Sequence, residues 1–124
     1  MRKALLSAAL LAAFATAAQA QDAGAKFAGS WRVTDDREST FTVVITDAGG
    51  KISGQVFDRP ITIGAANRNL LAIRWSDAGR NPGTSRANIR LDASGDRFTA
   101  TVNYHPPPDR HYPDIEGRWT GVRQ

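Results

Sequence analysis

Residues 39–57, STFTVVITDAGGKISGQVF, decide the expected fold. In the first half of the stretch, Phe41, Val43 and Ile45 alternate with residues that are mostly threonine. A period of two places the apolar side chains on one face and the polar ones on the other, as in a strand with one buried side. Asp47 begins an Asp-Ala-Gly-Gly turn, whose glycines accept the positive φ of a tight reversal, and the alternation then resumes. The stretch therefore predicts a β-hairpin.

The same combination of short apolar-alternating runs and turn residues recurs along the chain, and no window has a convincing helical period. The chain has no cysteine, so its core must be closed without disulfides, and a closed barrel does this because it leaves no free sheet edge. We therefore expect an all-β fold, an eight-stranded antiparallel up-and-down barrel. The expected strands are residues 28–34, 39–46, 51–57, 61–65, 69–75, 85–91, 97–104 and 115–122.

The first twenty residues have the pattern of an export signal rather than of a folded element. A basic start at Arg2 and Lys3 precedes an Ala- and Leu-rich run, and Ala18-Gln19-Ala20 has the form of a cleavage site. We predict cleavage after Ala20, a flexible N-terminus over residues 21–27 and a single barrel domain over residues 28–124. The expected location is periplasmic or secreted.

The charge pattern excludes some partner classes. Without Arg2 and Lys3 the net charge falls from +4 to +2, and aspartate and arginine alternate along the chain instead of forming a basic run. We therefore expect no nucleic-acid partner. After residue 20 no stretch is apolar for long enough to predict a membrane span.

The three tryptophans are evenly placed. Trp31, Trp75 and Trp119 lie 44 residues apart, and Asp-Ala-x-Gly turns begin at both Asp47 and Asp92. This spacing has two explanations, an internal duplication or the repeated turn chemistry of a meander. Both predict the same fold.

The two ends of the expected barrel domain carry a further pattern. A Gly29-x-Trp31 opening, an eight-strand meander and Arg123 on the last strand together resemble the calycin superfamily of lipocalins, fatty-acid-binding proteins and avidins. In that superfamily the first-strand tryptophan packs across the closed end of the barrel beneath an arginine or lysine from the last strand. The resemblance implies a structural closure made by Trp31 and Arg123, and a guanidinium over an indole face is a favourable contact.

Within that superfamily, residues 29–56 and 71–91 are most similar to avidins. The resemblance places a ligand-stacking tryptophan at Trp75. The three polar positions that hold the ureido ring of biotin in avidins read Val33, Ser39 and Val56 here, so only the serine is kept. Buried polar sites discriminate strongly through groups left unpaired, and we therefore expect no tight biotin binding.

The candidate site lies at the open end of the barrel. Aromatic and hydroxyl side chains at strand ends there point to non-catalytic binding of a small apolar or aromatic ligand. The chain has no nucleophile motif, phosphate loop or matched carboxylate pair, so we expect no enzyme activity and no cofactor. The predicted ligand-binding residues are Ser39, Trp75, Ser85, Tyr104 and Trp119.

Residues 104–117, YHPPPDRHYPDIEG, form the most unusual segment and support an alternative function. Three consecutive prolines favour a stiff, extended loop, which suits a protein-interaction module such as an inhibitor of a secreted hydrolase. His105, Asp109, His111 and Asp114 are metal-ligand types, but their spacing across prolines fits a zinc site poorly. We expect no metal here. The predicted partner is thus a small molecule or a secreted or periplasmic protein, and the sequence leaves the oligomeric state open.

Overall fold

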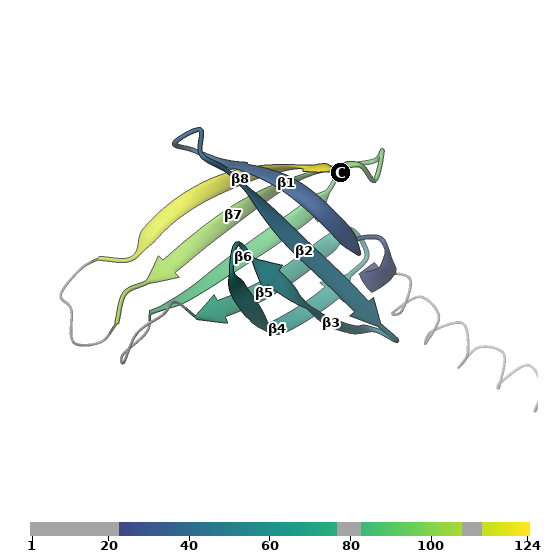
Figure 1. Ribbon diagram of the computed structural model, residues 1–124, viewed down its shortest axis with the longest axis horizontal. Coiled ribbons are helices and arrows are strands. Elements are labelled where there is room, and N and C mark those ends of the chain that lie inside the picture. Colours follow the sequence, from purple (N-terminus) through teal and green to yellow (C-terminus); the bar gives the residue numbers. More distant parts are fainter. Residues whose placement is uncertain (1–22, 77–82, 108–112) are drawn as a thin grey trace, which may run out of the picture.

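The eight predicted strands are all present in the computed structural model, which describes residues 23–76, 83–107 and 113–124. Each strand pairs antiparallel with the next, and β1 also pairs with β8, which closes an up-and-down barrel and confirms the predicted fold class (Figure 1). The predicted signal peptide, residues 1–20, lies outside the described residues. The strands are β1 (Gly29–Asp35), β2 (Thr40–Ala48), β3 (Lys51–Val56), β4 (Arg59–Asn67), β5 (Leu70–Ser76), β6 (Thr84–Leu91), β7 (Arg97–His105) and β8 (Ile115–Arg123).

The core fills the barrel and follows the alternation in the sequence. On β5, for example, Leu71, Ile73 and Trp75 are buried while the residues between them are exposed. A glycine on one strand leaves room for a large side chain on the next. A Cβ added to Gly121 would lie 2.2 Å from the ring of Phe98, so only glycine fits there. The buried apolar side chains from the strands are Trp31, Val33, Val43, Ile45, Ile52, Val56, Ile61, Leu71, Ile73, Trp75, Ala87, Ile89, Leu91, Phe98, Ala100 and Trp119.

The segment before β1 differs from our expectation of a flexible N-terminus. Residues 23–25 form one helical turn, and the Phe27 side chain is fully buried in the core. The sequence places a large apolar side chain two residues before the first strand, within reach of the barrel end, and burying a phenylalanine is favourable by about 2 kcal/mol. Residues 23–27 therefore belong to the folded domain. The described residues contain no helix long and apolar enough to cross a membrane.

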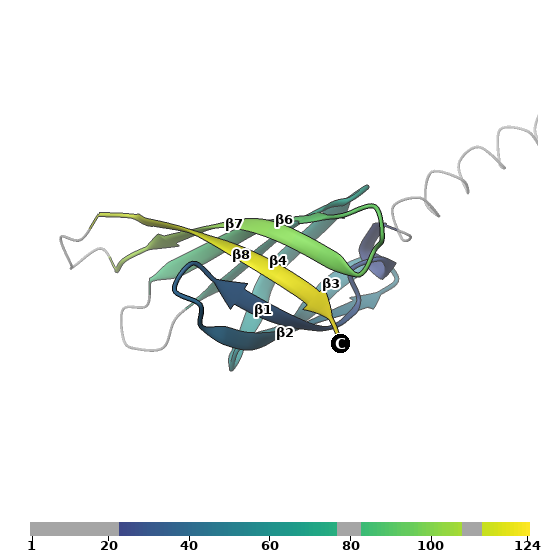
Figure 2. The same ribbon diagram turned by 90° about the horizontal axis from the view of Figure 1, so that it is seen from above.

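The two ends of the barrel differ in shape. We call the end where β1 begins and β8 ends the closed end, and the opposite one the open end. At the open end, the β3–β4 hairpin stops near the middle of the molecule in Figure 1, while β7 and β8 run on to the left. Figure 2 shows the same extension of β7 and β8 from above. Pairing between β1 and β8 accordingly stops at Asp35 and Trp119, so the first residues of β8 lack a neighbour from β1.

Candidate functional site

The closed end is sealed by Trp31 and Arg123. The indole of Trp31 is fully buried, and its Nε1–H donates to the backbone carbonyl of Phe27 at 2.8 Å. Phe98 packs on the same indole at 5.1 Å between ring centres. On the outer side the guanidinium carbon of Arg123 lies 4.3 Å from the centre of the indole ring. The tryptophan is thus enclosed on each side.

Arg123 also connects three separate parts of the chain. Its guanidinium donates to the carbonyls of Lys26 and Ala28, each at 2.6 Å, and to the carbonyl of Gly95 at 3.0 Å. The first two carbonyls precede β1 and the third lies in the β6–β7 hairpin. A planar guanidinium supplies several donors in a fixed arrangement, so one side chain can satisfy all of these acceptors together. The Arg123 side chain thus covers Trp31 at the closed end of the barrel.

At the open end three aromatic side chains meet across the barrel. Trp75 of β5 stacks on Trp119 of β8, with ring centres 5.5 Å apart and an angle of 25° between the planes. Phe41 of β2 contacts Trp119 edge-to-face at 5.1 Å. Because β2, β5 and β8 lie on different sides of the barrel, these rings span its interior. Buried apolar side chains pack in the interior below these rings, and the candidate site lies above the aromatic layer.

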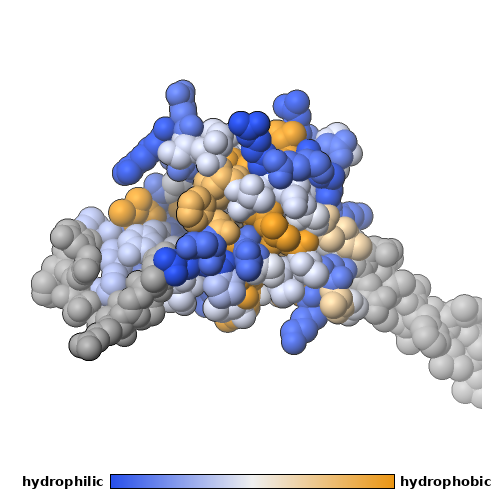
Figure 3. All heavy atoms as spheres, viewed as in Figure 1, coloured by the Kyte–Doolittle hydropathy of each residue, from blue (hydrophilic) through white to orange (hydrophobic). Residues whose placement is uncertain are grey.

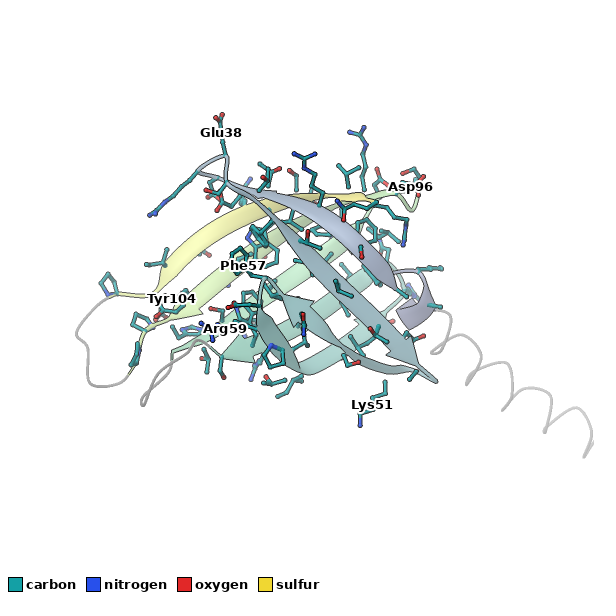
Figure 4. The ribbon with its side chains drawn as sticks, viewed as in Figure 1. Glu38, Lys51, Phe57, Arg59, Asp96 and Tyr104 are labelled. Atoms are coloured by element: carbon teal, nitrogen blue, oxygen red, sulfur yellow. The ribbon has the colours of Figure 1, made fainter. Side chains whose placement is uncertain are left out.

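A hollow of about 370 Å³ lies on the outer side of this layer and is the candidate site. Phe41, Val56 and Trp75 line it from the barrel, and the β3–β4 turn supplies Phe57, Asp58 and Arg59. The volume is within the range of small-molecule sites, about 300–1,000 Å³. Figure 4 shows Phe57 at the tip of this turn and Arg59 below it at the start of β4, and in the same view Figure 3 shows apolar side chains reaching the surface there.

Phe57 is held in this position by an unfavourable backbone conformation. Its φ is +62°, in the left-handed region, while its N–H donates to the carbonyl of Thr42 at 3.1 Å. Glycine or asparagine is the usual residue there, because Cβ crowds the backbone. The residue is 69% exposed, and its ring contacts that of Phe41 edge-to-face at 6.3 Å between centres. A large apolar side chain thus occupies a strained turn without being buried.

Arg59 gives the hollow a positive group. Its Nε lies 3.4 Å from the carboxylate of Asp58, and the arginine and aspartate side chains are 37% and 67% exposed. An ion pair so exposed contributes at most about 1 kcal/mol. The guanidinium can therefore turn toward an anionic group of a ligand at little cost.

Ser85 and Tyr104 continue the inner row of the open end from Trp75. Ser85 of β6 is directly opposite Trp75 on one side and Tyr104 of β7 on the other. Ser85 is 5% exposed, and Tyr104 is half-buried against Gly83. These two residues border the aromatic layer but do not line the hollow at Phe57.

Ser39 lies apart from the other predicted site residues. It is exposed in the β1–β2 hairpin, where its N–H donates to the carboxylate of Asp35 at 2.9 Å. Figure 4 shows the neighbouring Glu38 at the outer tip of this hairpin, away from Phe57. The β1–β2 hairpin is also at the open end, so all five predicted ligand residues lie at this end of the barrel, but Ser39 is in an exposed turn and outside the row formed by the others.

The proline-rich loop is described only near its two bases. His105 Nδ1 lies 2.9 Å from the Asp114 carboxylate, so two of the four residues considered as metal ligands pair with each other. Asp109 and His111 lie outside the described residues. The alternative of a protein-interaction loop therefore stays a prediction.

Comparison with known proteins adds no relative: no family model, curated protein or solved structure matches this chain. The site is therefore argued from its own residues. Sequence reasoning missed Phe57 and Arg59, whose one signal was an aromatic residue followed by Asp-Arg-Pro at the end of an alternating strand.

Proposed function

We propose that this protein is a non-catalytic binding protein, which takes a small, flat, apolar or aromatic ligand into the hollow at the open end. The ligand lies on Phe41 and Trp75, and the ring of Phe57 covers one side of it. Aromatic pairs contribute about 0.5–1.5 kcal/mol each beyond the area that they bury. A ligand with an anionic group binds best, because Arg59 is close enough to exchange its exposed partner Asp58 for that group.

The observation that carries this proposal is the strained, exposed Phe57 beside an aromatic floor. A left-handed conformation in a residue other than glycine costs about 1–3 kcal/mol, and such strain collects at ligand-binding positions. Phe57 gains little by burial in the free protein, since the residue is 69% exposed. Covering a ligand gives this side chain the contacts that the fold itself does not provide.

The sequence also supports export and a distant relation to the calycins as parts of this proposal. The basic and apolar pattern of residues 1–20 supports an export signal, and the closure by Trp31 and Arg123 matches the arrangement expected from the calycin resemblance. A role as an exported carrier or scavenger of small ligands is consistent with both features.

A titration with two fluorescent probes tests the proposal. N-phenylnaphthylamine is neutral, and anilinonaphthalene sulfonate has the same rings with an anionic group. We expect both to bind, the sulfonate more tightly. Trp75→Leu should weaken binding about tenfold through loss of ring stacking. Phe57→Ala should weaken it less.

The matched control is Val122→Ala, which removes an apolar side chain that is 46% exposed near the closed end. This variant should bind both probes like the unchanged protein. If Trp75→Leu and Val122→Ala bind both probes with the affinity of the unchanged protein, the hollow is not the binding site and the proposal fails.

A further inference from the structure

Charge is segregated on the outside of the barrel in a way that the linear sequence hides. The strands β5 to β8 contain one acidic residue, Glu116, whereas the acidic residues elsewhere in the domain lie mainly in the hairpin turns. Five arginines face outward from these four strands. We call this surface the basic wall; its arginines are Arg74, Arg86, Arg90, Arg97 and Arg118.

Within the described parts of the chain, the guanidinium groups of the basic wall form no ion pair with a carboxylate, although the backbone N–H of Arg118 donates to the Asp36 carboxylate at 2.6 Å. The ion pairs among the described residues are formed by Arg59, His105 and Arg123, none of which belongs to the basic wall. Arg74 lies directly opposite Arg86 on the neighbouring strand, and like charges in this position destabilise a sheet. Arg86 also has a buried Nε atom without a hydrogen-bond partner. An anion bound from outside would relieve both costs.

The basic wall contains a groove of about 740 Å³. Its lining comes from β4 to β8, with no residue of β1, β2 or β3, so the groove lies on the outer face and not in the barrel interior. Two rows of outward side chains run across the strands, and the inward row between them, which includes Ile89 and Ala100, contributes the floor. Arg90 stands in one row and Arg118 in the other.

The remaining side chains of the groove fit a sugar better than a phosphate chain. Exposed Leu70 and Ala72 offer an apolar surface to the C–H face of a sugar ring. Asparagine and threonine both donate and accept hydrogen bonds, as sugar hydroxyl groups do, whereas phosphate oxygens only accept. The neutral polar residues of the groove are Asn67, Asn88, Thr99, Thr101 and Thr120.

Single-stranded nucleic acid fits the groove less well. Proteins that bind it stack the bases on exposed aromatic side chains. Among the described residues that line the groove, Trp119 is the sole aromatic one, and its ring stacks on Trp75 inside the barrel. A row across β5 to β8, which are consecutive neighbours in the barrel, covers about 14 Å at the usual spacing of strands. This length accommodates a short segment of a linear polymer.

We propose that the groove of the basic wall binds a segment of an acidic polysaccharide. Arg90 and Arg118 pair with its carboxylate or sulfate groups, which match the fork of donors on a guanidinium. Asn88 and Thr101 bond to its hydroxyl groups. Arg74 and Arg86 line a further hollow of about 270 Å³ toward the open end and hold the next anionic group of the chain. The groove shares no residue with the hollow at Phe57, whereas Trp75 lines both that hollow and the further one at Arg74 and Arg86.

Binding is tested with four probes at two salt concentrations: oligogalacturonate, a heparin oligosaccharide, polyphosphate and oligothymidylate of matched charge. Either saccharide, or both, should bind more tightly than polyphosphate and oligothymidylate. Arg90→Gln combined with Arg118→Gln should weaken saccharide binding at least about tenfold, since each removes a charge-assisted contact. The matched control is Arg37→Gln in the exposed β1–β2 hairpin, combined with Lys51→Gln at the exposed start of β3, which makes the same change in net charge elsewhere.

A variant that leaves the net charge unchanged separates recognition of the sugar hydroxyl groups from the attraction between charges. Asn88→Ala should weaken saccharide binding several-fold, while any weak polyphosphate binding stays unchanged. Near-ultraviolet circular dichroism verifies that each variant is folded. Three outcomes would each overturn the proposal: oligothymidylate or polyphosphate binds as tightly as the saccharides, the control double variant loses as much affinity as the wall variant, or no probe binds at low salt.

Discussion

The two ends of the barrel both contain tryptophan, and they use it differently. At the closed end, Trp31 is fully buried, its N–H is bonded to Phe27 and its outer face is covered by Arg123. At the open end, Trp75 stacks on Trp119 and borders a hollow with the exposed ring of Phe57 beside it. An aromatic side chain that is packed on every side stabilises the fold, whereas one that borders an unfilled hollow can also contact a ligand.

Removal of the closed-end tryptophan should have the largest effect. Trp31→Ala is expected to lower the free energy of unfolding by about 3–5 kcal/mol, because it leaves a cavity under Arg123 and an unpaired carbonyl at Phe27. Trp75→Ala should cost clearly less, since one side of Trp75 already faces the hollow. Urea unfolding followed by circular dichroism measures both. Equal losses would contradict the assignment of different roles to the two ends.

Removal of the arginine seal should have the next largest effect. Arg123→Ala loses the contact with the Trp31 indole and the bonds to three carbonyls, for an expected cost of about 2–3 kcal/mol in unfolding free energy. Affinity for naphthalene probes at the open end should remain within about twofold of the original. Arg37→Ala, in an exposed turn, is the control and should alter stability by less than about 0.5 kcal/mol.

Replacement of the strained phenylalanine should separate stability from binding. Phe57→Asn gives the turn a residue that tolerates positive φ, so the free energy of unfolding should stay the same or rise by up to about 1 kcal/mol. The same variant should bind the probes more weakly. A loss of stability above about 1 kcal/mol would instead make Phe57 part of the core.

The smallest effect concerns the pH dependence of the β6–β7 turn at the closed end. The Ser94 hydroxyl and backbone N–H groups donate to the Asp92 carboxylate and lower its pKa from the ordinary 3.8. This contribution to stability is therefore present above pH 3.8 and is lost as the pH falls through the lower folded value. Ser94→Ala should reduce stability slightly at neutral pH. That difference should disappear in strong acid, as thermal melts at a series of pH values would show.

The strands could be predicted from the sequence because alternation is a local pattern. Every expected strand is present, and the largest boundary shifts are of two residues: β2 ends at Ala48 instead of residue 46, and β4 spans Arg59–Asn67 instead of residues 61–65. Near the end of β4, Ala66 packs against the core. Because alanine is small, the alternation of apolar and polar residues was too weak there to mark where the strand ends. The contact of Arg123 with Trp31 was expected only through resemblance to the calycins.

The parts that sequence reasoning missed depend on contacts distant along the chain or on unusual local geometry. The stack of Trp75 on Trp119 joins residues 44 positions apart, and nothing in either strand alone indicates it. The left-handed conformation of Phe57 was hidden because phenylalanine rarely adopts it. Aspartate and arginine alternate along the sequence, but folding places the arginines on strands and many acids in turns. The basic wall exists only in three dimensions.

The most direct test of the difference between the ends uses the indole N–H signals of the three tryptophans in a two-dimensional ¹H–¹⁵N spectrum. Single Trp→Phe variants assign them, and N-phenylnaphthylamine is then titrated into the unchanged protein. The Trp75 and Trp119 signals should shift together with a single affinity, while that of Trp31 stays in place. A shift of the Trp31 signal as large as theirs, or a shift of Trp31 alone, would contradict a binding site confined to the open end.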